Sequence, residues 1–167
     1  MAGTRLAEKT AIVTGASAIS RGAGMGRTIA ELFGREGAKV VAVDVAPDGK
    51  ATADRIRAAG GEAIFVQADV TRREDVSRVV ESALEHFGTL QILINVVGGS
   101  LGEKEFLDVD DSYWQRIVDV NLKSVHLTCQ LSIPHLVKAG GSIVHISSTN
   151  GLMGCPGLAT YSAAKSG

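Results

Sequence analysis

The residues of this chain that are best suited to chemistry gather near its C-terminal end. Tyr161 and Lys165 are four positions apart, so a helix would place both side chains on one face, one turn apart. A free phenol has a pKa of about 10, too high for an efficient base near neutral pH, but a nearby ammonium group stabilises the phenolate. The pair is suited to exchange a proton with an alcohol or carbonyl oxygen, although tyrosine and lysine at this spacing are also common on exposed helices.

A glycine-rich segment lies between the first predicted strand and the first predicted helix. It runs from Thr14 to Gly26 and includes Gly15, Gly24 and Met25. Phosphate groups bind where backbone N–H groups are free of side chains at the positive end of a helix dipole, so this segment predicts a dinucleotide site. Any tight strand-to-helix turn favours glycine, and the prediction therefore rests on the strand–loop–helix context and on an acid that ends the second strand.

That acid is Asp44. A carboxylate at this point of a nucleotide-binding fold accepts hydrogen bonds from the ribose hydroxyls of the adenosine half and repels a 2′-phosphate. Asp44 therefore favours NAD over NADP as the cofactor. Two alternatives stay open: Asp44 caps the strand or the next loop, or Arg21, a cation in the glycine-rich segment, binds a 2′-phosphate.

Short β-branched segments alternate along the chain with longer segments of helical period. The predicted strands are Thr10–Val13, Lys39–Val43, Ala63–Val66, Leu90–Ile94 and Ser142–Ile146. Four helices lie between them, and Pro134 should kink or end the longest. This alternation predicts the α/β class, with a doubly wound parallel sheet that helices cover on both faces. With no internal repeat or linker, we expect a single domain over residues 1–167.

Two patterns predict where helices begin. Thr71 with Glu74, and Ser112 with Gln115, have the spacing of a capping box. In this motif a hydroxyl accepts a hydrogen bond from the backbone N–H three residues later. We therefore expect helices to start directly after Thr71 and Ser112.

Composition and charge exclude several classes of function. The net charge of −1 and the aromatic fraction of 4% give no basis for binding nucleic acid or an anionic membrane. Apolar segments have strand length and no signal peptide is evident. Cys129, Cys155 and the four histidines have no metal-ligand spacing, so we expect no metal site. A reducing cytoplasmic location fits best.

Taken in order, the motifs resemble those of the short-chain dehydrogenase/reductase family, whose domain is Rossmann-like. The family's Thr-Gly-x-x-x-Gly-x-Gly motif matches Thr14, Gly15, Gly24 and Gly26, with additional residues inserted before the later pair. Its adenine-pocket pair matches Asp69-Val70, which could alternatively cap a strand end, and its Asn-Asn-Ala-Gly motif appears as Asn95-Val96-Val97-Gly98. The resemblance implies a cofactor-binding set of Gly15, Gly24, Met25, Gly26, Asp44, Asp69, Val70, Asn95, Tyr161 and Lys165.

The same resemblance implies an NAD(P)-dependent oxidoreductase that acts on a secondary alcohol or ketone. Its catalytic residues would be Asn121, Ser148, Tyr161 and Lys165. Tyr161 would be the general acid/base, Ser148 would polarise the carbonyl, Lys165 would also hold the nicotinamide ribose, and Asn121 would support a water-mediated proton path. Taken without the resemblance, Ser148 could be a strand-end hydrogen bonder and Asn121 an ordinary helix residue.

Family members continue beyond the Tyr-x-x-x-Lys helix. We therefore expect this domain to be incomplete at its C-terminus, with the last strands of the sheet missing from the chain. The resemblance also implies a small-molecule alcohol or ketone as substrate, and a homo-oligomer (dimer or tetramer) for the full-length protein. The alternative function is a truncated, catalytically inactive nucleotide-binding module or fragment.

Overall fold

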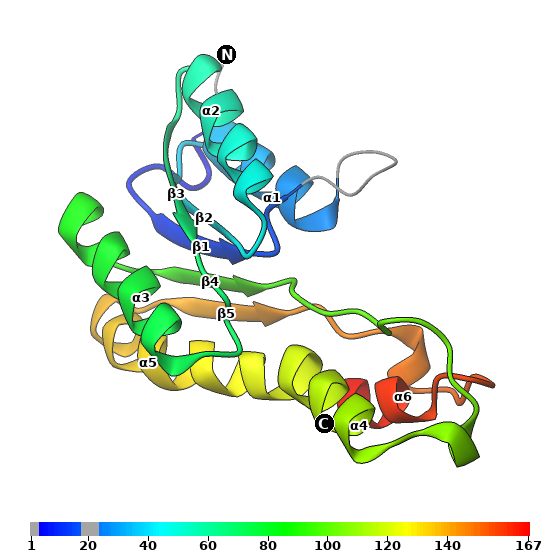
Figure 1. The fold of residues 1–167 in the computed structure, drawn as a ribbon. Helices are drawn as coiled ribbons and strands as arrows, with labels where there is room; N and C mark the ends of the chain where they lie inside the picture. The colour runs from blue at the N-terminus through cyan, green and yellow to red at the C-terminus, as the bar shows by residue number, and fades with distance from the viewer. Residues whose placement is uncertain (1–3, 18–23) are drawn as a thin grey trace.

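The computed structural model describes residues 4–17 and 24–167 and contains a parallel five-stranded sheet in the order β3-β2-β1-β4-β5 (Figure 1). The strands are β1 (Thr10–Thr14), β2 (Lys39–Asp44), β3 (Glu62–Gln67), β4 (Ile92–Asn95) and β5 (Ser142–His145). Each predicted strand is present, with its ends displaced by at most two residues. The predicted α/β fold with a parallel sheet is confirmed.

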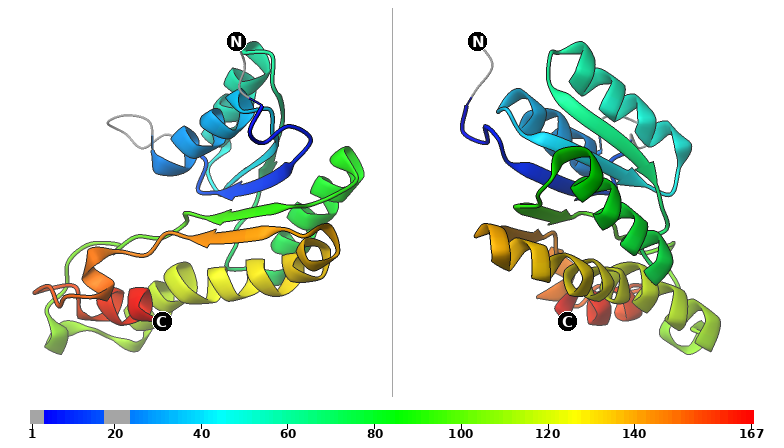
Figure 2. Two further views of the ribbon diagram at one scale, coloured as in Figure 1. Left: turned by 180° about the vertical axis from the view of Figure 1, so that it is seen from behind. Right: turned by 90° about the vertical axis from the view of Figure 1, so that its left-hand side faces the viewer.

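Helices cover both faces of the sheet (Figures 1 and 2). One face carries α1 (Met25–Arg35) and α2 (Lys50–Ala58), and the other carries α3 (Arg73–Phe87) and α5 (Ser124–Ala139). Short helices α4 (Asp111–Val118) and α6 (Ala159–Ser166) lie beyond the carboxyl ends of β4 and β5. Within the described ranges, no helix combines the length and the apolar character that a membrane span needs.

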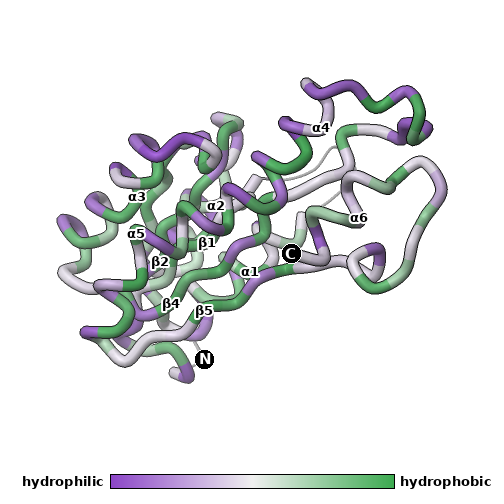
Figure 3. Tube along the Cα trace, turned by 90° about the horizontal axis from the view of Figure 1, so that it is seen from below, coloured by the Kyte–Doolittle hydropathy of each residue, from purple (hydrophilic) through white to green (hydrophobic). Residues whose placement is uncertain are grey.

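Both faces of the central strands are buried in separate hydrophobic clusters. Val40 and Ala42 of β2 pack towards α1 and α2, whereas Val41 and Val43 pack towards α3 and α5. This is why the strands are continuously apolar, as strands buried on both faces are. Figure 3 shows the same pattern, with hydrophobic strands inside and helices whose turns alternate between hydrophobic and hydrophilic.

Both capping-box predictions are wrong. The Thr71 hydroxyl donates instead to Asp69 Oδ1 at 2.7 Å, and α3 begins at Arg73 without a side-chain cap. Asp110 caps α4 by accepting the Tyr113 N–H at 2.8 Å. In each case an aspartate close to the hydroxyl competes for it, since a carboxylate is a stronger acceptor than a hydroxyl.

Pro134 does not end the long helix. The chain passes from α4 through a π-helical turn, η3 (Asp119–Lys123), into α5, which continues beyond Pro134 to Ala139. Pro134 is exposed, so water can satisfy the carbonyl that its missing N–H leaves unpaired. Leu127 and Leu136 are buried on either side of it and keep the helix packed on the sheet.

Two arginines occupy the outer edge of β3. Arg57 Nη1, from α2, donates to the Ala63 carbonyl at 2.7 Å, and Arg78 Nη1, from α3, donates to the Gln67 carbonyl at 2.9 Å. Ala63 and Gln67 are four residues apart, so their carbonyls point to the same edge, away from β2. One guanidinium therefore reaches this edge from each face of the sheet.

An aspartate on the same helix fixes each arginine. Asp54 accepts from Arg57 and Asp75 accepts from Arg78. An open strand edge presents backbone groups that can pair with another chain, and charged side chains are a common protection against it. We infer that Arg57 and Arg78 limit pairing through the edge of β3.

The double substitution R57A/R78A should therefore increase self-association, because it frees two strand carbonyls. Light scattering during prolonged warming should rise faster than for the unmodified protein. The control R35A/R116A removes the same charge from two exposed helix positions for which the described residues show no side-chain bond to a strand. If both double variants associate equally fast, net charge and not edge protection limits association.

Candidate active site

A cleft of about 730 Å³ lies at the carboxyl ends of the strands, between β1 and β4, where the chain turns from one half of the sheet to the other. Open α/β sheets bind ligands at this point. The described residues that line the cleft are Gly15, Ser17, Gly24, Met25, Gly26, Asp44, Val45, Ala46, Asp48, Ala68, Asp69, Val70, Thr71, Val96, Val97, Gly98, Leu101 and Val120. Seven of the ten residues predicted to bind a cofactor are among them: Gly15, Gly24, Met25, Gly26, Asp44, Asp69 and Val70.

Two glycines allow the backbone to pack closely at the floor of the cleft. Gly15 has φ +68°, and a Cβ there would lie 3.2 Å from the Val97 nitrogen. A Cβ on Gly26, in the first turn of α1, would overlap the Gly15 carbonyl. Because no side chain intervenes, the start of α1 is open to a phosphate group, as at other helix N-termini that bind phosphates.

Asp44 is half-buried at the end of β2 and is held by backbone groups. Its Oδ2 accepts the Ser17 N–H at 2.9 Å and its Oδ1 accepts the Ala46 N–H at 3.0 Å. The Ser17 hydroxyl is buried and has no partner among the described residues. The Ser17 hydroxyl and the remaining lone pairs of the Asp44 carboxylate could therefore form hydrogen bonds with the ribose hydroxyls of a dinucleotide. Sequence analysis did not identify Ser17, although its place in the glycine-rich segment was a signal.

Asp69 and Val70 form the neighbouring wall of the cleft, after β3. Asp69 Oδ1 accepts both the N–H and the hydroxyl of Thr71, at 2.9 and 2.7 Å. The Asp69 N–H donates to Asp75 Oδ2 at 2.8 Å, and this bond, aided by Arg78, lowers the pKa of the Asp75 carboxyl. These contacts fix the backbone of the wall.

Asn95, at the end of β4, contacts two neighbouring elements. Its side chain is buried and lies within 3.0 Å of both Thr128 Oγ1 and His145 Nδ1, and it does not line the cleft. Asn95 therefore joins β4, β5 and α5. Like Tyr161 and Lys165, it is not among the residues that line the cleft, and its part in binding a cofactor remains a prediction.

The Tyr161–Lys165 pair lies on α6, as the spacing predicts. Lys165 Nζ donates to the Ile146 carbonyl at 3.0 Å and lies 6.0 Å from the centroid of the Tyr161 ring. Burial lowers the pKa of Lys165. For the Tyr161 hydroxyl, the described residues provide no hydrogen bond, which leaves this group available to a ligand.

Asn121 lies in the π-helical turn and is buried. Its side chain accepts the Gly99 N–H and donates to the Gly99 carbonyl, both at 2.9 Å, and donates to the Ile117 carbonyl at 2.9 Å. A Cβ on Gly98 would lie 2.8 Å from Asn121 Oδ1 and 2.7 Å from Lys165 Nζ. The side chains of Asn121 and Lys165 therefore both lie close to Gly98, which also lines the cleft.

Ser148 follows β5 and caps the short helix η4 (Thr149–Gly151) by accepting the Asn150 N–H at 3.2 Å. This helix packs tightly on α6, because a Cβ on Gly151 would lie 2.6 Å from the Lys165 carbonyl. The Ser148 hydroxyl proton remains available to a ligand in this arrangement. The structure thus brings the segments that carry all four predicted catalytic residues to one end of the sheet, whereas Arg21 lies outside the described residues.

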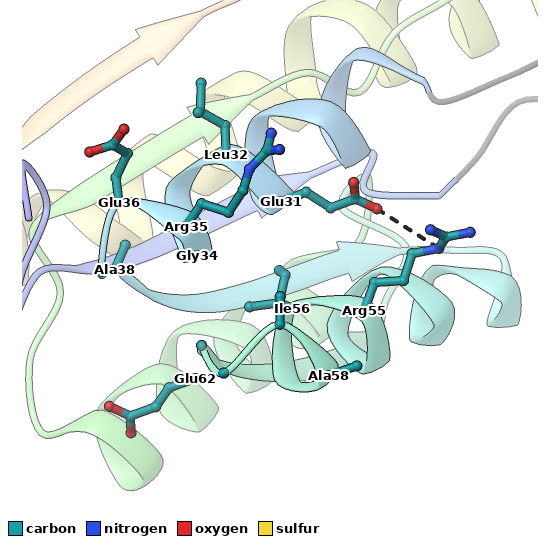
Figure 4. A pocket seen from close by; sticks show the side chains of 14 residues that line it. Glu31, Leu32, Gly34, Arg35, Glu36, Ala38, Arg55, Ile56, Ala58 and Glu62 are labelled. Carbon is teal, nitrogen blue, oxygen red and sulfur yellow. Dashed lines mark ion pairs between the residues drawn. The ribbon is translucent and has the colours of Figure 1, made fainter. Parts of the chain in front are cut away.

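A second hollow, of about 870 Å³, lies at the opposite end of the strands, between the C-terminal halves of α1 and α2 (Figure 4). Its charged side chains belong to Glu31, Arg35, Glu36, Arg55 and Glu62, and Glu31 approaches Arg55 to 4.0 Å. No serine, threonine, tyrosine, histidine or cysteine is among the residues that line it. Across residues 4–17 and 24–167, no three potential ligands gather to hold a metal ion. The hydroxyl groups of Ser148 and Tyr161 and the Lys165 ammonium group lie at the other end of the sheet.

This chain is similar in sequence and in structure to known dehydrogenases. The chain is 39% identical to trans-4-hydroxycyclohexanecarboxylate dehydrogenase of Sinomonas cyclohexanicum, over 98% of this chain and 63% of that protein. It is 36% identical to glucose 1-dehydrogenase 2 of Bacillus subtilis, over 97% and 62%. The structure of carveol dehydrogenase from Mycobacterium avium in complex with NAD superposes with a TM-score of 0.90 and 31% identity, over 98% and 63%.

The chain thus spans slightly less than two thirds of the length of these relatives. The model of the short chain dehydrogenase family matches residues 9–167. The resemblance that the motifs indicated is confirmed, and the chain belongs to the short-chain dehydrogenase family.

Proposed function

We propose that this protein is an NAD(P)-dependent oxidoreductase that interconverts a secondary alcohol and a ketone. The proposal is supported by one observation: Lys165 Nζ and Asn121 Oδ1 both lie close to Gly98, which lines the cleft. Gly98 therefore belongs to the cleft that we propose for the dinucleotide and lies beside Lys165, one member of the pair that we propose for proton exchange. Such proximity is what a reaction between a bound cofactor and a substrate requires.

The residues that would hold the dinucleotide follow from the cleft. Gly15, Gly24 and Gly26, with Met25 between the last two, suit its pyrophosphate, and Asp69 and Val70 suit its adenine. Asp44 favours NAD over NADP, because its carboxylate accepts hydrogen bonds from ribose hydroxyls and repels a 2′-phosphate. The bound nicotinamide supplies the hydride donor or acceptor.

The chain's own groups would handle the proton. The Tyr161 hydroxyl exchanges a proton with the substrate oxygen, and the Lys165 ammonium stabilises the phenolate form. The Ser148 hydroxyl donates a hydrogen bond to the same oxygen and polarises a carbonyl there. Asn121 keeps Gly98 and Gly99 in place beside Lys165, and its part in a proton path remains a prediction.

A secondary alcohol on a six-membered ring is the substrate class that we propose. The two named dehydrogenases among the relatives act on hydroxycyclohexanecarboxylate and glucose, and the superposed structure is a carveol dehydrogenase. Each of these compounds carries its hydroxyl on a six-membered ring.

We further propose that the protein is a cytoplasmic homo-oligomer. Three large apolar side chains are exposed on α4 and α5, those of Trp114, Ile133 and Val137. Exposed apolar groups on one long helical element suit contact with a second copy. Both cysteines, Cys129 and Cys155, are free, which suits a reducing compartment.

Cofactor preference should depend on Asp44. We expect NADH to bind more tightly than NADPH, and Asp44→Ala to reduce the ratio of their affinities by about ten-fold, the size expected for loss of a charged hydrogen-bond acceptor. Fluorescence titration measures both affinities. Asp48→Ala is the matched control, since Asp48 is an exposed acid on the same cleft and should leave the ratio unchanged. Tighter binding of NADPH by the unmodified protein would contradict the proposal.

Turnover should depend on Tyr161 far more than cofactor binding does. With 4-hydroxycyclohexanecarboxylate and NAD, Tyr161→Phe should lower kcat by about 10²- to 10⁴-fold, because it removes only the proton-exchanging group. The affinity for NADH should change little. Lys165→Ala should lower both kcat and affinity, and Lys138→Ala, at an exposed position of α5, should affect neither. Substantial turnover by Tyr161→Phe would mean that another group exchanges the proton.

A further inference from the structure

Leu101 has a backbone conformation that side chains disfavour. Its φ is +55°, and the next residue, Gly102, has φ +99°. In the left-handed region the Cβ of an L-residue approaches the following carbonyl oxygen. Leu101 lines the cleft with 54% of its surface exposed. Strain of this kind persists only where surrounding structure enforces it, and it is concentrated at ligand sites.

A single side chain holds both neighbours of Leu101. The Tyr113 hydroxyl, from the first turn of α4, lies 3.0 Å from the Ser100 carbonyl and 2.9 Å from the Gly102 carbonyl. The two carbonyls that flank Leu101 therefore share one hydroxyl as donor. Only 7% of Tyr113 is exposed, so its hydroxyl proton has these carbonyls as its partners instead of bulk water.

Tyr113 is itself fixed by charged groups. Asp110 Oδ1 accepts the Tyr113 N–H at 2.8 Å, and Asp110 Oδ2 accepts from Lys104 Nζ at 2.7 Å. Lys104 Nζ lies 5.1 Å from the centroid of the Tyr113 ring, within range of a cation–π contact. Hydrogen bonds from Lys104 and Ser112 hold the pKa of Asp110 well below its usual range.

We propose that Tyr113 is a positioning residue of the cleft: its hydroxyl holds Leu101 in the left-handed conformation and so keeps the Leu101 side chain against the bound dinucleotide. Asn121 already fixes Gly99. Two side chains of the α4–η3 helix, those of Tyr113 and Asn121, therefore hold the loop after β4, and we call the contact of Tyr113 with the residues that flank Leu101 the Tyr113 clamp. The proposal rests on the proposed function only for the identity of the ligand. The effect of the Tyr113 clamp on the backbone conformation of Leu101 can be tested without any ligand.

The first test compares thermal unfolding of two variants. Leu101→Gly and Leu101→Ala both remove the leucine side chain, but only glycine adopts a positive φ without strain. Leu101→Gly should therefore unfold at a higher temperature than Leu101→Ala. Tyr113→Phe should lower the unfolding temperature of the unmodified protein more than that of Leu101→Gly, which has no strained residue to hold. If the two Leu101 variants unfold at the same temperature, the Tyr113 clamp does not hold residue 101 in a strained conformation and the inference is overturned.

The second test is a double-mutant cycle on the Kd of NADH, measured by isothermal titration calorimetry. Tyr113→Phe should raise Kd by about five-fold, the range for loss of one neutral hydrogen bond, and Leu101→Gly by about ten-fold, the range for loss of a partly buried leucine contact. The double variant should resemble Leu101→Gly alone, because Tyr113 acts through Leu101. Arg116→Ala, which shortens an exposed side chain of α4, should leave Kd unchanged.

The outcomes separate the inference from the proposed function. If the effects of Tyr113→Phe and Leu101→Gly on Kd multiply, Tyr113 does not act through Leu101 and the inference is overturned. If NADH binds and Leu101→Gly leaves Kd unchanged, Leu101 does not contact the dinucleotide and the inference is likewise overturned. If the unmodified protein binds neither NADH nor NADPH, the proposed function itself fails and the role of the clamp in binding fails with it.

Discussion

The two hydrogen bonds between the Asn121 side chain and the backbone of Gly99 are the constraint on which the candidate site depends. They join the loop after β4 to the long helix, because the Asn121 side chain pairs with both the N–H and the C=O of Gly99. Asn121 lies in the π-helical turn. There its side-chain NH₂ group donates to the Ile117 carbonyl, while its side-chain oxygen accepts the Gly99 N–H. Local departures from α-helical geometry are often found at functional sites for such reasons.

The remaining elements of the site follow from this attachment. With Gly99 held, Gly98 lies so close to Lys165 Nζ that a Cβ at this position would be 2.7 Å from it, and a side chain there would displace the ammonium group. The Ile146 carbonyl at the end of β5 fixes the same nitrogen. A parallel sheet brings all its carboxyl ends to one edge, so the glycine-lined cleft after β1 and the proton-exchanging groups after β5 become neighbours although they are far apart in sequence.

Sequence alone predicted the strands well and placed Asp44 at the end of β2, because hydrophobic periodicity and an acid at a strand end are local signals. It failed at the starts of α3 and α4, where Asp69 and Asp110 compete for the hydroxyls of Thr71 and Ser112. It missed Tyr113, since its role depends on carbonyls that only the folded chain brings to it. It also could not show that the Asn95 side chain lies beside Thr128 and His145, because a motif gives residue type and spacing but not side-chain direction.

Amide hydrogen exchange at Gly99 tests the central claim most directly. Gly99 lies in a loop, and its N–H donates to Asn121 Oδ1. The account predicts that this amide is protected in the unmodified protein, and that Asn121→Ala raises its exchange rate by about ten-fold or more while Ile94 in β4 keeps its protection. Exchange of the Gly99 amide at the rate of an unprotected loop in the unmodified protein would contradict the account.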